Sequence, residues 1–292
     1  MTRLGLIAVL ALLIAGCGGQ DSPSASAPDA RRQAVQPPRP DEGIPQDPDL
    51  LAARLRQTDA GLDDAIDRWR EGGGLGERTP REVLLYALYE QRIYRLLTPR
   101  EKLSDDVLER LRGSLDAEAR DILAARRELG SLAAPPQPRR RFATGPSLPP
   151  AKLMRFYRKA ERRFEVSWKV LAAVNFVETS FNKLRNRSTA GAQGPMQFIP
   201  STWDAYGMGG DIHDPHDAIM GAANYLHASG APGNYRRALY AYNHSDHYVD
   251  SVLGYTRRIR RDENAFLSFH SWQVFVNTPS GIVRITGPGA ER

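Results

Sequence analysis

Apolar residues recur at helical spacing along two stretches of the chain, and proline-rich polar segments separate the stretches. In residues 49–130, leucines, isoleucines and a tryptophan stand mostly three or four positions apart, which is typical of amphipathic helices. Gly72-Gly73-Gly74 interrupts this pattern, and Thr79-Pro80-Arg81-Glu82 is typical of a new helix start. We predict a helical region here. It shows no catalytic residues, so we interpret it as a packing or spacer unit, and a binding role for partner proteins stays open.

The second apolar stretch, residues 149–262, is long enough to form a single core. Residues 272–276 and 282–286 then alternate in strand fashion around a turn at 277–281, which predicts a β-hairpin in the C-terminal segment 263–292. Because an isolated hairpin is marginally stable, we expect it to pack on another element. The predicted fold class is mainly α, with an N-terminal helical region and a C-terminal β-hairpin.

The N-terminus has the pattern of an export signal. A positive start, Met1-Thr2-Arg3, precedes an apolar run from Leu4 to Ala15 that is too short for a comfortable permanent membrane span. Residues 18–48 are rich in proline, alanine, serine and charge, which predicts a disordered tether. Residues 131–148 carry further prolines and three consecutive arginines, and we interpret them as a second linker.

The end of the export signal, Leu13-Ile14-Ala15-Gly16-Cys17, resembles the lipobox of bacterial lipoproteins. The resemblance implies that residues 1–17 are a lipoprotein signal, and that Cys17 becomes the lipidated N-terminus of a membrane-anchored protein. A plain secretory signal with a chance cysteine is the alternative. Cys17 is the only cysteine in the sequence, so an intramolecular disulfide is excluded.

The charge balance adds a constraint on partners. The formal net charge is +6 and the pI about 9.5, which in an exported protein favours an anionic partner such as a membrane surface or an acidic wall polymer. Nucleic acid is not expected, because the signal directs the chain out of the cytoplasm. The sequence also has neither zinc-finger spacing nor a phosphate-binding glycine loop.

One predicted helix carries a carboxylate within its apolar stripe. Ser167 is a plausible cap for this helix, and four residues share its apolar face: Leu171, Val174, Glu178 and Phe181. Desolvation and the negative end of the helix dipole both raise the pKa of a glutamate placed there, as a general acid requires. The alternative interpretation is a structural ion pair between Glu178 and Arg185 or Arg187.

Three motifs stand in order along the chain, and the first of them begins at this glutamate. They are Glu178-Thr179-Ser180-Phe181-Asn182 with Ser188, then Gly191-Ala192-Gln193-Gly194-Pro195-Met196-Gln197, then Ala241-Tyr242-Asn243. Together they resemble the lytic murein transglycosylases, which share a goose-lysozyme-like fold. Residues 211–219 and 223–226 are similar to the branch that includes the membrane-bound B type. The resemblance extends over about residues 153–259 and implies a lysozyme-like catalytic domain.

The resemblance implies roles for individual positions. Glu178 matches the sole catalytic acid/base, and the matching substrate-binding positions are Ser188, Gly194, Met196, Gln197, Tyr242 and Asn243. Three positions depart from the common family pattern. Thr179 stands where serine is frequent, Pro195 stands where leucine is common, and His244 follows Tyr242-Asn243 where a glycine often comes soon after.

The implied activity is cleavage of the β-1,4 bond between N-acetylmuramic acid (MurNAc) and N-acetylglucosamine (GlcNAc) in peptidoglycan. It forms 1,6-anhydro-MurNAc ends and needs no cofactor. A usual glycosidase has two carboxylates, and no second acidic residue has a comparably apolar setting in this sequence. The nearest alternative is a lysozyme-type hydrolase, and another is a non-catalytic wall-binding module on the same fold.

Two histidine pairs raise the alternative of a metal site. His213 and His216 repeat the spacing of His244 and His247, and such a spacing presents two imidazoles together on a helix. Both pairs stand at predicted turns or caps beside aspartates. We therefore interpret them as solvated surface residues and predict no metal ligands.

Overall fold

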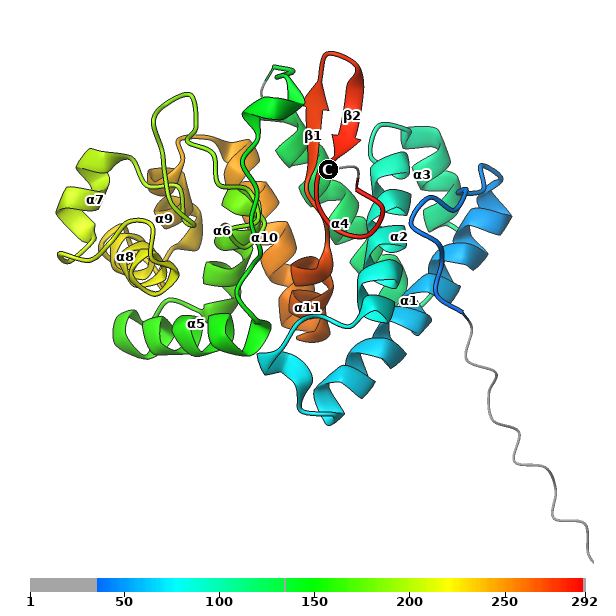
Figure 1. Ribbon diagram of the computed structural model, residues 1–292, viewed down its shortest axis with the longest axis horizontal. Helices are drawn as coiled ribbons and strands as arrows, with labels where there is room; N and C mark the ends of the chain where they lie inside the picture. Colours follow the sequence, from blue (N-terminus) through cyan, green and yellow to red (C-terminus); the bar gives the residue numbers. More distant parts are fainter. Residues whose placement is uncertain (1–35, 134, 291–292) are drawn as a thin grey trace, which may run out of the picture. The chain divides into compact units, whose positions relative to one another are not determined.

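The computed structural model describes residues 36–133 and 135–290 (Figure 1). The predicted signal peptide, Cys17 and residues 18–35 of the predicted tether lie outside the described residues. The described part contains eleven α-helices, two short 3₁₀ turns and one two-stranded hairpin. The predicted fold class, mainly α with a C-terminal hairpin, is confirmed. No helix among the described residues is long and apolar enough to cross a membrane.

The first four helices form the N-terminal region: α1 (Pro48–Glu71), α2 (Arg81–Leu97), α3 (Glu101–Leu108) and α4 (Ser114–Ser131). Helix α1 begins where the Asp47 carboxylate accepts hydrogen bonds from the backbone N–H groups of Asp49 and Leu50. Its apolar face is buried from Leu51 to Trp69. Helix α2 begins one residue later than the motif Thr79-Pro80-Arg81-Glu82 predicts, with Pro80 rather than Thr79 at the N-cap, and no side chain caps it.

Seven further helices follow: α5 (Pro150–Phe164), α6 (Trp168–Thr179), α7 (Pro200–Tyr206), α8 (Pro215–Ala228), α9 (Tyr235–Tyr242), α10 (Asp246–Arg261) and α11 (Asn264–Ser271). Side-chain caps fix the start of four of them, and these caps are Ser167, Asp214, Asn234 and Ser245. The predicted helix with Glu178 is α6. Ser167 caps it as predicted, and Glu178 stands near its end.

Helix α10 packs against α4 on one side and α6 on the other, so the two helical regions share one core. Gly254 allows the close approach, because a Cβ atom there would lie 2.8 Å from the Cβ atom of Ala125 on α4. A buried ion pair, Arg258 to Glu118 at 2.9 Å, joins the same two helices. We expected residues 49–130 to be a spacer or packing unit, and they pack directly against the predicted catalytic region.

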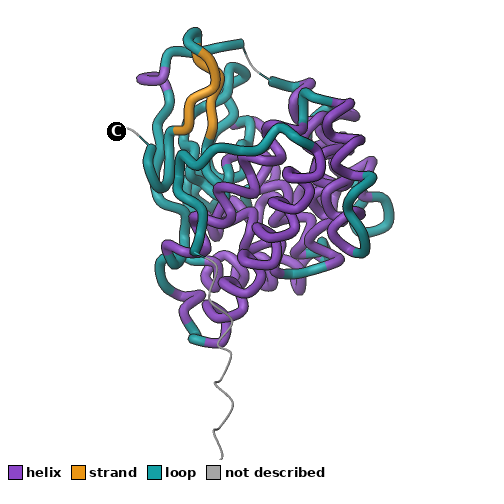
Figure 2. Tube along the Cα trace, turned by 90° about the vertical axis from the view of Figure 1, so that its right-hand side faces the viewer, coloured by secondary structure: helices purple, strands orange, loops and turns teal. Residues whose placement is uncertain are grey.

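The hairpin pairs β1 (Phe275–Thr278) with β2 (Gly281–Arg284) in antiparallel register. It packs on the helices as expected, with the Arg95 guanidinium of α2 lying 4.1 Å from the centre of the Phe275 ring. Figure 2 shows the hairpin and neighbouring loops gathered on one side of the helices.

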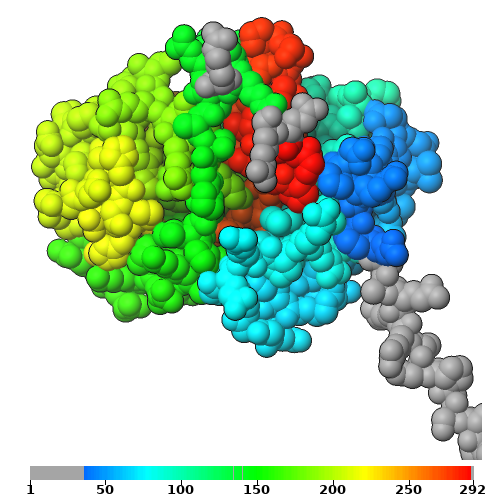
Figure 3. Space-filling view, in the orientation of Figure 1, coloured from blue at the N-terminus to red at the C-terminus, as the bar shows by residue number. Residues whose placement is uncertain are grey.

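Residues 142–149, here called the strap, belong mostly to the predicted linker but are fixed to the protein. The Gly145 N–H donates to the Lys183 carbonyl, and the Arg185 N–H donates to the Ala143 carbonyl. In Figure 3 the strap follows the green ridge that crosses the visible face beside the red C-terminal residues. Most of the strap lies in the segment interpreted as a second linker, and these hydrogen bonds fix it to residues 183–185.

The end of the predicted tether is also bound to the protein. The Tyr89 hydroxyl donates to the Gly43 carbonyl at 2.8 Å, and Arg92 donates to the Pro40 carbonyl at 3.2 Å. Pro38 is buried. The predicted disorder up to residue 48 is therefore wrong for residues 36–47, because side chains of α2 supply the donors that this proline-rich segment lacks.

Candidate active site

Glu178 is the penultimate residue of α6, and an unusual turn follows it. Ser180, Phe181 and Asn182 all have left-handed backbones, with φ of 50°, 60° and 64°. Thr179 stabilises this turn from within. Its hydroxyl donates to the Pro195 carbonyl at 2.7 Å and accepts from the Asn182 N–H at 2.9 Å. The helix end that carries Glu178 is therefore tied to the glycine-containing loop around Pro195.

The Glu178 carboxyl is half-buried and has one strong hydrogen bond. Tyr248 on α10 donates its hydroxyl to Glu178 Oε1 at 2.7 Å. Burial raises the pKa of Glu178 to about 7, although the hydrogen bond from Tyr248 opposes this rise. Within the described residues no basic side chain forms an ion pair with Glu178, and Arg185 donates to the Pro146 carbonyl instead. The alternative interpretation, an ion pair between Glu178 and Arg185 or Arg187, is therefore wrong.

Four tyrosine rings lie in a row that begins at Tyr206 and ends at Tyr248, the hydrogen-bond partner of Glu178. Ring centres are 4.6 Å apart for Tyr206 and Tyr225, 5.6 Å for Tyr225 and Tyr242, and 6.4 Å for Tyr242 and Tyr248. These rings come from α7, α8, α9 and α10, so the row depends on the packing of four helices. Aromatic rings with polar tips suit ligands that have both apolar faces and hydroxyl groups, as sugars do.

Gly194 has a structural reason to be glycine. Its φ is +78°, and a Cβ atom there would lie 2.0 Å from the Ile212 carbonyl oxygen. Gln197 in the same loop also has a positive φ, 48°, and its Nε2 donates to the carbonyls of Asn186 and Gly194. Both residues therefore shape the loop from within. A substrate role for either stays a prediction.

Met196 corrects one sequence-based expectation. We expected its side chain to line the sugar groove, but the residue is wholly buried and cannot touch a ligand in this conformation. Its sulfur accepts from Asn175 Nδ2 at 2.9 Å, and its carbonyl accepts from the Tyr242 hydroxyl at 2.7 Å. Met196 therefore joins the loop to α6 and α9.

The remaining predicted binding residues lie on the surface. Ser188 is exposed, and its hydroxyl accepts from the Ala192 N–H at 3.0 Å. Asn243 is exposed directly after α9. In the described part of the chain no hydrogen bond joins either residue to Glu178, whereas Tyr248 donates to its carboxylate.

Three side chains on α8 and its cap come close enough to hold a cation: Asp214, His216 and Asp217. Each already has a partner. Asp214 caps α8, and Asp217 accepts from His216 Nδ1 at 2.8 Å and from the Asp211 N–H. Of the other histidine pair, His247 Nδ1 lies 2.7 Å from Glu128 Oε2. Helix capping and ion pairing account for these groups without a metal.

A comparison with protein families finds a match for the part of the chain that contains Glu178. Residues 155–264 match the model of the transglycosylase SLT domain. This SLT domain extends from α5 to the first residue of α11, and it contains Glu178, the glycine loop and the tyrosine row. The match supports the lytic transglycosylase family and indicates lytic transglycosylase-type activity on peptidoglycan. No curated protein and no solved structure matches the chain.

Tyr248 is the residue of the SLT domain that sequence reasoning missed. It follows Asn243 by five positions, in the first turn of α10, and it is 2% exposed. A buried tyrosine usually finds a hydrogen-bond partner for its hydroxyl. The sequence does place Tyr248 close after Tyr242-Asn243, but only the crossing of α10 with α6 reveals that its partner is Glu178.

Proposed function

We propose that the protein is a lytic transglycosylase that cleaves the MurNAc–GlcNAc β-1,4 bond and leaves 1,6-anhydro-MurNAc ends. The observation that carries this proposal is the setting of Glu178. Its carboxyl is half-buried and lacks a basic partner within the described residues, and its pKa is raised to about 7. The neutral form, which can donate a proton, is therefore well populated near neutral pH.

In the proposed reaction, protonated Glu178 donates its proton to the glycosidic oxygen as the bond to C1 of MurNAc breaks. Because the Tyr248 hydroxyl donates to Oε1, we assign the transferred proton to Oε2. The Glu178 carboxylate then accepts the proton of the MurNAc 6-hydroxyl, whose oxygen bonds to C1. The glutamate regains its proton, and water is not consumed.

The scarcity of acids near Glu178 favours this route over ordinary hydrolysis. A glycosidase of the usual kind needs a second carboxylate as nucleophile or as base for water. Among the described residues no other carboxylate contributes to the raised pKa of Glu178, whose causes are burial and the Tyr248 hydrogen bond. An internal 6-hydroxyl, positioned by the sugar itself, removes the need for a second protein base.

We further propose that the protein is exported and anchored in a membrane through lipidated Cys17, facing the cell wall. Support comes from the lipobox-like sequence and from the net charge of +6, which suits an anionic surface. Replacing Cys17 by serine should move the protein from the membrane fraction to the soluble fraction of cells. Retention of Cys17→Ser in membranes would contradict lipid anchoring.

Mass spectrometry of digested peptidoglycan tests the reaction itself. Anhydro ends are one water lighter than reducing ends, so the proposal expects the lighter products from the wild type. Glu178→Gln should lose about 10²- to 10⁴-fold of the rate, as expected for loss of a general acid. Glu165→Gln, an exposed glutamate outside the site, is the matched control and should keep full activity.

Two outcomes would replace the proposal. Reducing ends alone would make the protein a lysozyme-type hydrolase. Binding to peptidoglycan without any cleavage, by wild type and Glu178→Gln alike, would make it a wall-binding module.

A further inference from the structure

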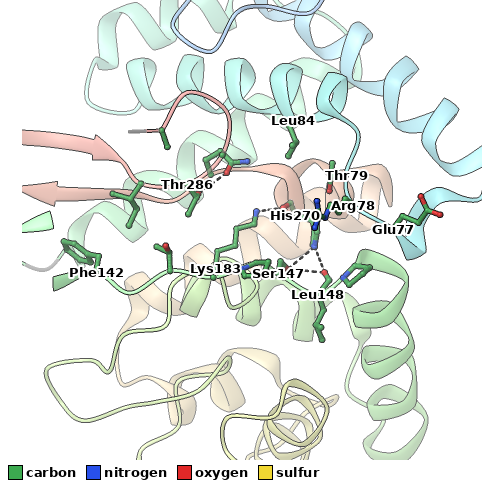
Figure 4. Close-up of a pocket in the computed structure, with 18 of the residues that line it drawn as sticks. Glu77, Arg78, Thr79, Leu84, Phe142, Ser147, Leu148, Lys183, His270 and Thr286 are labelled. Carbon is green, nitrogen blue, oxygen red and sulfur yellow. Dashed lines mark hydrogen bonds between the residues drawn. The ribbon is translucent and has the colours of Figure 1, made fainter. Parts of the chain in front are cut away.

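A cavity of about 1100 Å³ lies beside the strap, and Glu178 does not line it (Figure 4). Its walls come from the loop before α2, the strap, α11 and the segment after β2. Apolar side chains form much of the lining, including Leu84, Phe142, Leu148 and Ile285. Its size is slightly above the range of typical small-ligand pockets. Only one lining residue, Lys183, belongs to the SLT domain.

The charge of the lining favours an anion. Lys183 is 8% exposed, and its ammonium donates to the carbonyls of Trp272, at 2.5 Å, and His270. An ammonium has three donors, so one N–H remains for a ligand. Burial lowers the pKa of Lys183 to about 7, and a bound anion would oppose that effect. Arg78 and Arg139 also line the cavity, and Glu77 is the only acid that does.

The strap offers the backbone edge that an extended peptide needs. Ala143 and Gly145 direct their backbone groups toward Arg185 and Lys183, and Thr144 forms the bridge between them. Successive residues of an extended strand direct these groups to opposite sides. The N–H and C=O of Thr144 therefore point away from the 183–185 segment. Thr144 lines the cavity, and no backbone hydrogen bond of the described residues uses these two groups.

We propose that this cavity binds an extended peptide with a free carboxylate. The peptide would pair with the Thr144 edge, place small apolar side chains against the apolar wall, and direct its carboxylate to Lys183 and Arg78. Resting on the proposed function, the inferred ligand is the stem peptide carried by peptidoglycan. Lys183 follows Glu178 by five residues, so their Cα atoms are at most about 18 Å apart. An extended stem of four or five residues covers a similar length.

Calorimetric titration of the full chain tests this inference without needing catalysis. The probes are tetra-alanine with a free C-terminal carboxylate, the same peptide as its C-terminal amide, and decanoate as an acyl carboxylate without a peptide backbone. We expect the free peptide to bind at least tenfold more tightly than the amide and than decanoate. Binding near pH 8 should be accompanied by proton uptake at Lys183, which titrations in buffers of different ionisation enthalpy measure.

Two exposed arginines provide a matched pair of variants. Arg78→Gln, inside the cavity lining, should weaken the free peptide severalfold, whereas Arg81→Gln, exposed and outside the lining, should not. Lys183→Met should reduce the preference for carboxylate over amide, because Arg78 remains. Because Lys183 also holds two carbonyls, circular dichroism must show that this variant is folded, and Arg78→Gln supplies the test if it is not.

Failure of the cavity proposal is distinguishable from failure of the proposed function. Equal affinity for the peptide and its amide, tighter binding of decanoate, or an unchanged affinity in Arg78→Gln would overturn the cavity proposal while leaving cleavage intact. Glu178→Gln should bind the peptide like the wild type. On peptidoglycan, Arg78→Gln should slow cleavage of peptide-bearing strands and leave amidase-stripped strands unaffected, and equal effects on both would count against a stem-peptide site.

Discussion

Replacing Tyr248 by phenylalanine should shift the alkaline limit of the proposed activity upward. The Tyr248 hydroxyl donates to Glu178 Oε1 at 2.7 Å, and a hydrogen bond of this kind stabilises the ionised carboxylate more than the neutral acid. Removing the hydroxyl therefore raises the pKa of Glu178. Phenylalanine keeps the ring, which is 2% exposed and stacks at 5° to Tyr242, so the packing should persist.

The size of the shift follows from the hydrogen bond. A bond to a charged group contributes about 1.5 to 3 kcal/mol and one to a neutral group about 1 kcal/mol, so the two protonation states differ by about 0.5 to 2 kcal/mol. Because about 1.4 kcal/mol corresponds to one pKa unit, the pKa of Glu178 should move from about 7 to about 8. The acid form then persists to higher pH.

The assay is the rate of peptidoglycan solubilisation between about pH 5 and pH 10, fitted for the pH at which the rate falls to half. Tyr157→Phe is the matched control, because it removes another buried tyrosine hydroxyl for which no hydrogen bond to Glu178 exists among the described residues. Its profile should follow that of the wild type. An alkaline limit of Tyr248→Phe that is unchanged or lower than in the wild type would refute the reasoning.

Three further predictions concern stability. Tyr157→Phe should raise the free energy of unfolding by about 1 kcal/mol in urea titrations, since its buried hydroxyl has no partner, and a loss of stability would contradict this. Gly194→Ala should cost about 1 to 3 kcal/mol, seen as a lower melting temperature, because φ is +78° and the Ile212 carbonyl leaves no space; an unchanged melting temperature would contradict it. Burial raises the pKa of Asp59 to about 8 and that of Asp63 to about 7, so both favour folding at low pH and disfavour it as pH rises. Asp59→Asn/Asp63→Asn should therefore gain stability relative to the wild type between about pH 4 and pH 8, and a constant difference would speak against the raised pKa values.

Periodicity and capping predict the helices well because both depend on neighbouring residues. The Ser167 cap, the place of Glu178 near the end of α6 and the C-terminal hairpin are all visible in the sequence and present in the structure. The predicted apolar face fits less well, because Phe181 lies beyond the end of α6 with a left-handed backbone. The same local patterns do not show whether the side chain of a loop residue faces the core or the surface, because that depends on the elements packed around the loop. Met196 illustrates this, because the loop that looks like a sugar-binding segment turns its side chain into the core.

Segments that lack regular structure were predicted least well. The composition of residues 18–48 predicts a disordered tether and that of residues 131–148 a linker, since neither has enough apolar residues to form a core alone. The described ends of both are nevertheless held by hydrogen bonds to partners distant in sequence, such as Tyr89 for Gly43 and Lys183 for Gly145. Long-range bonds of this kind leave no periodic signal.

The position of α10 explains why the N-terminal helices matter to the site. One side of α10 packs on α4, where Gly254 permits close contact and Arg258 forms its buried ion pair with Glu118. The other side packs on α6, and Tyr248 in the first turn of α10 reaches Glu178 there. A shift of α10 relative to α6 changes the length of a 2.7 Å hydrogen bond, and with it the pKa of the acid. The helices outside the SLT domain therefore belong to the frame that sets the protonation of Glu178, because they hold the helix that supplies its hydrogen-bond donor.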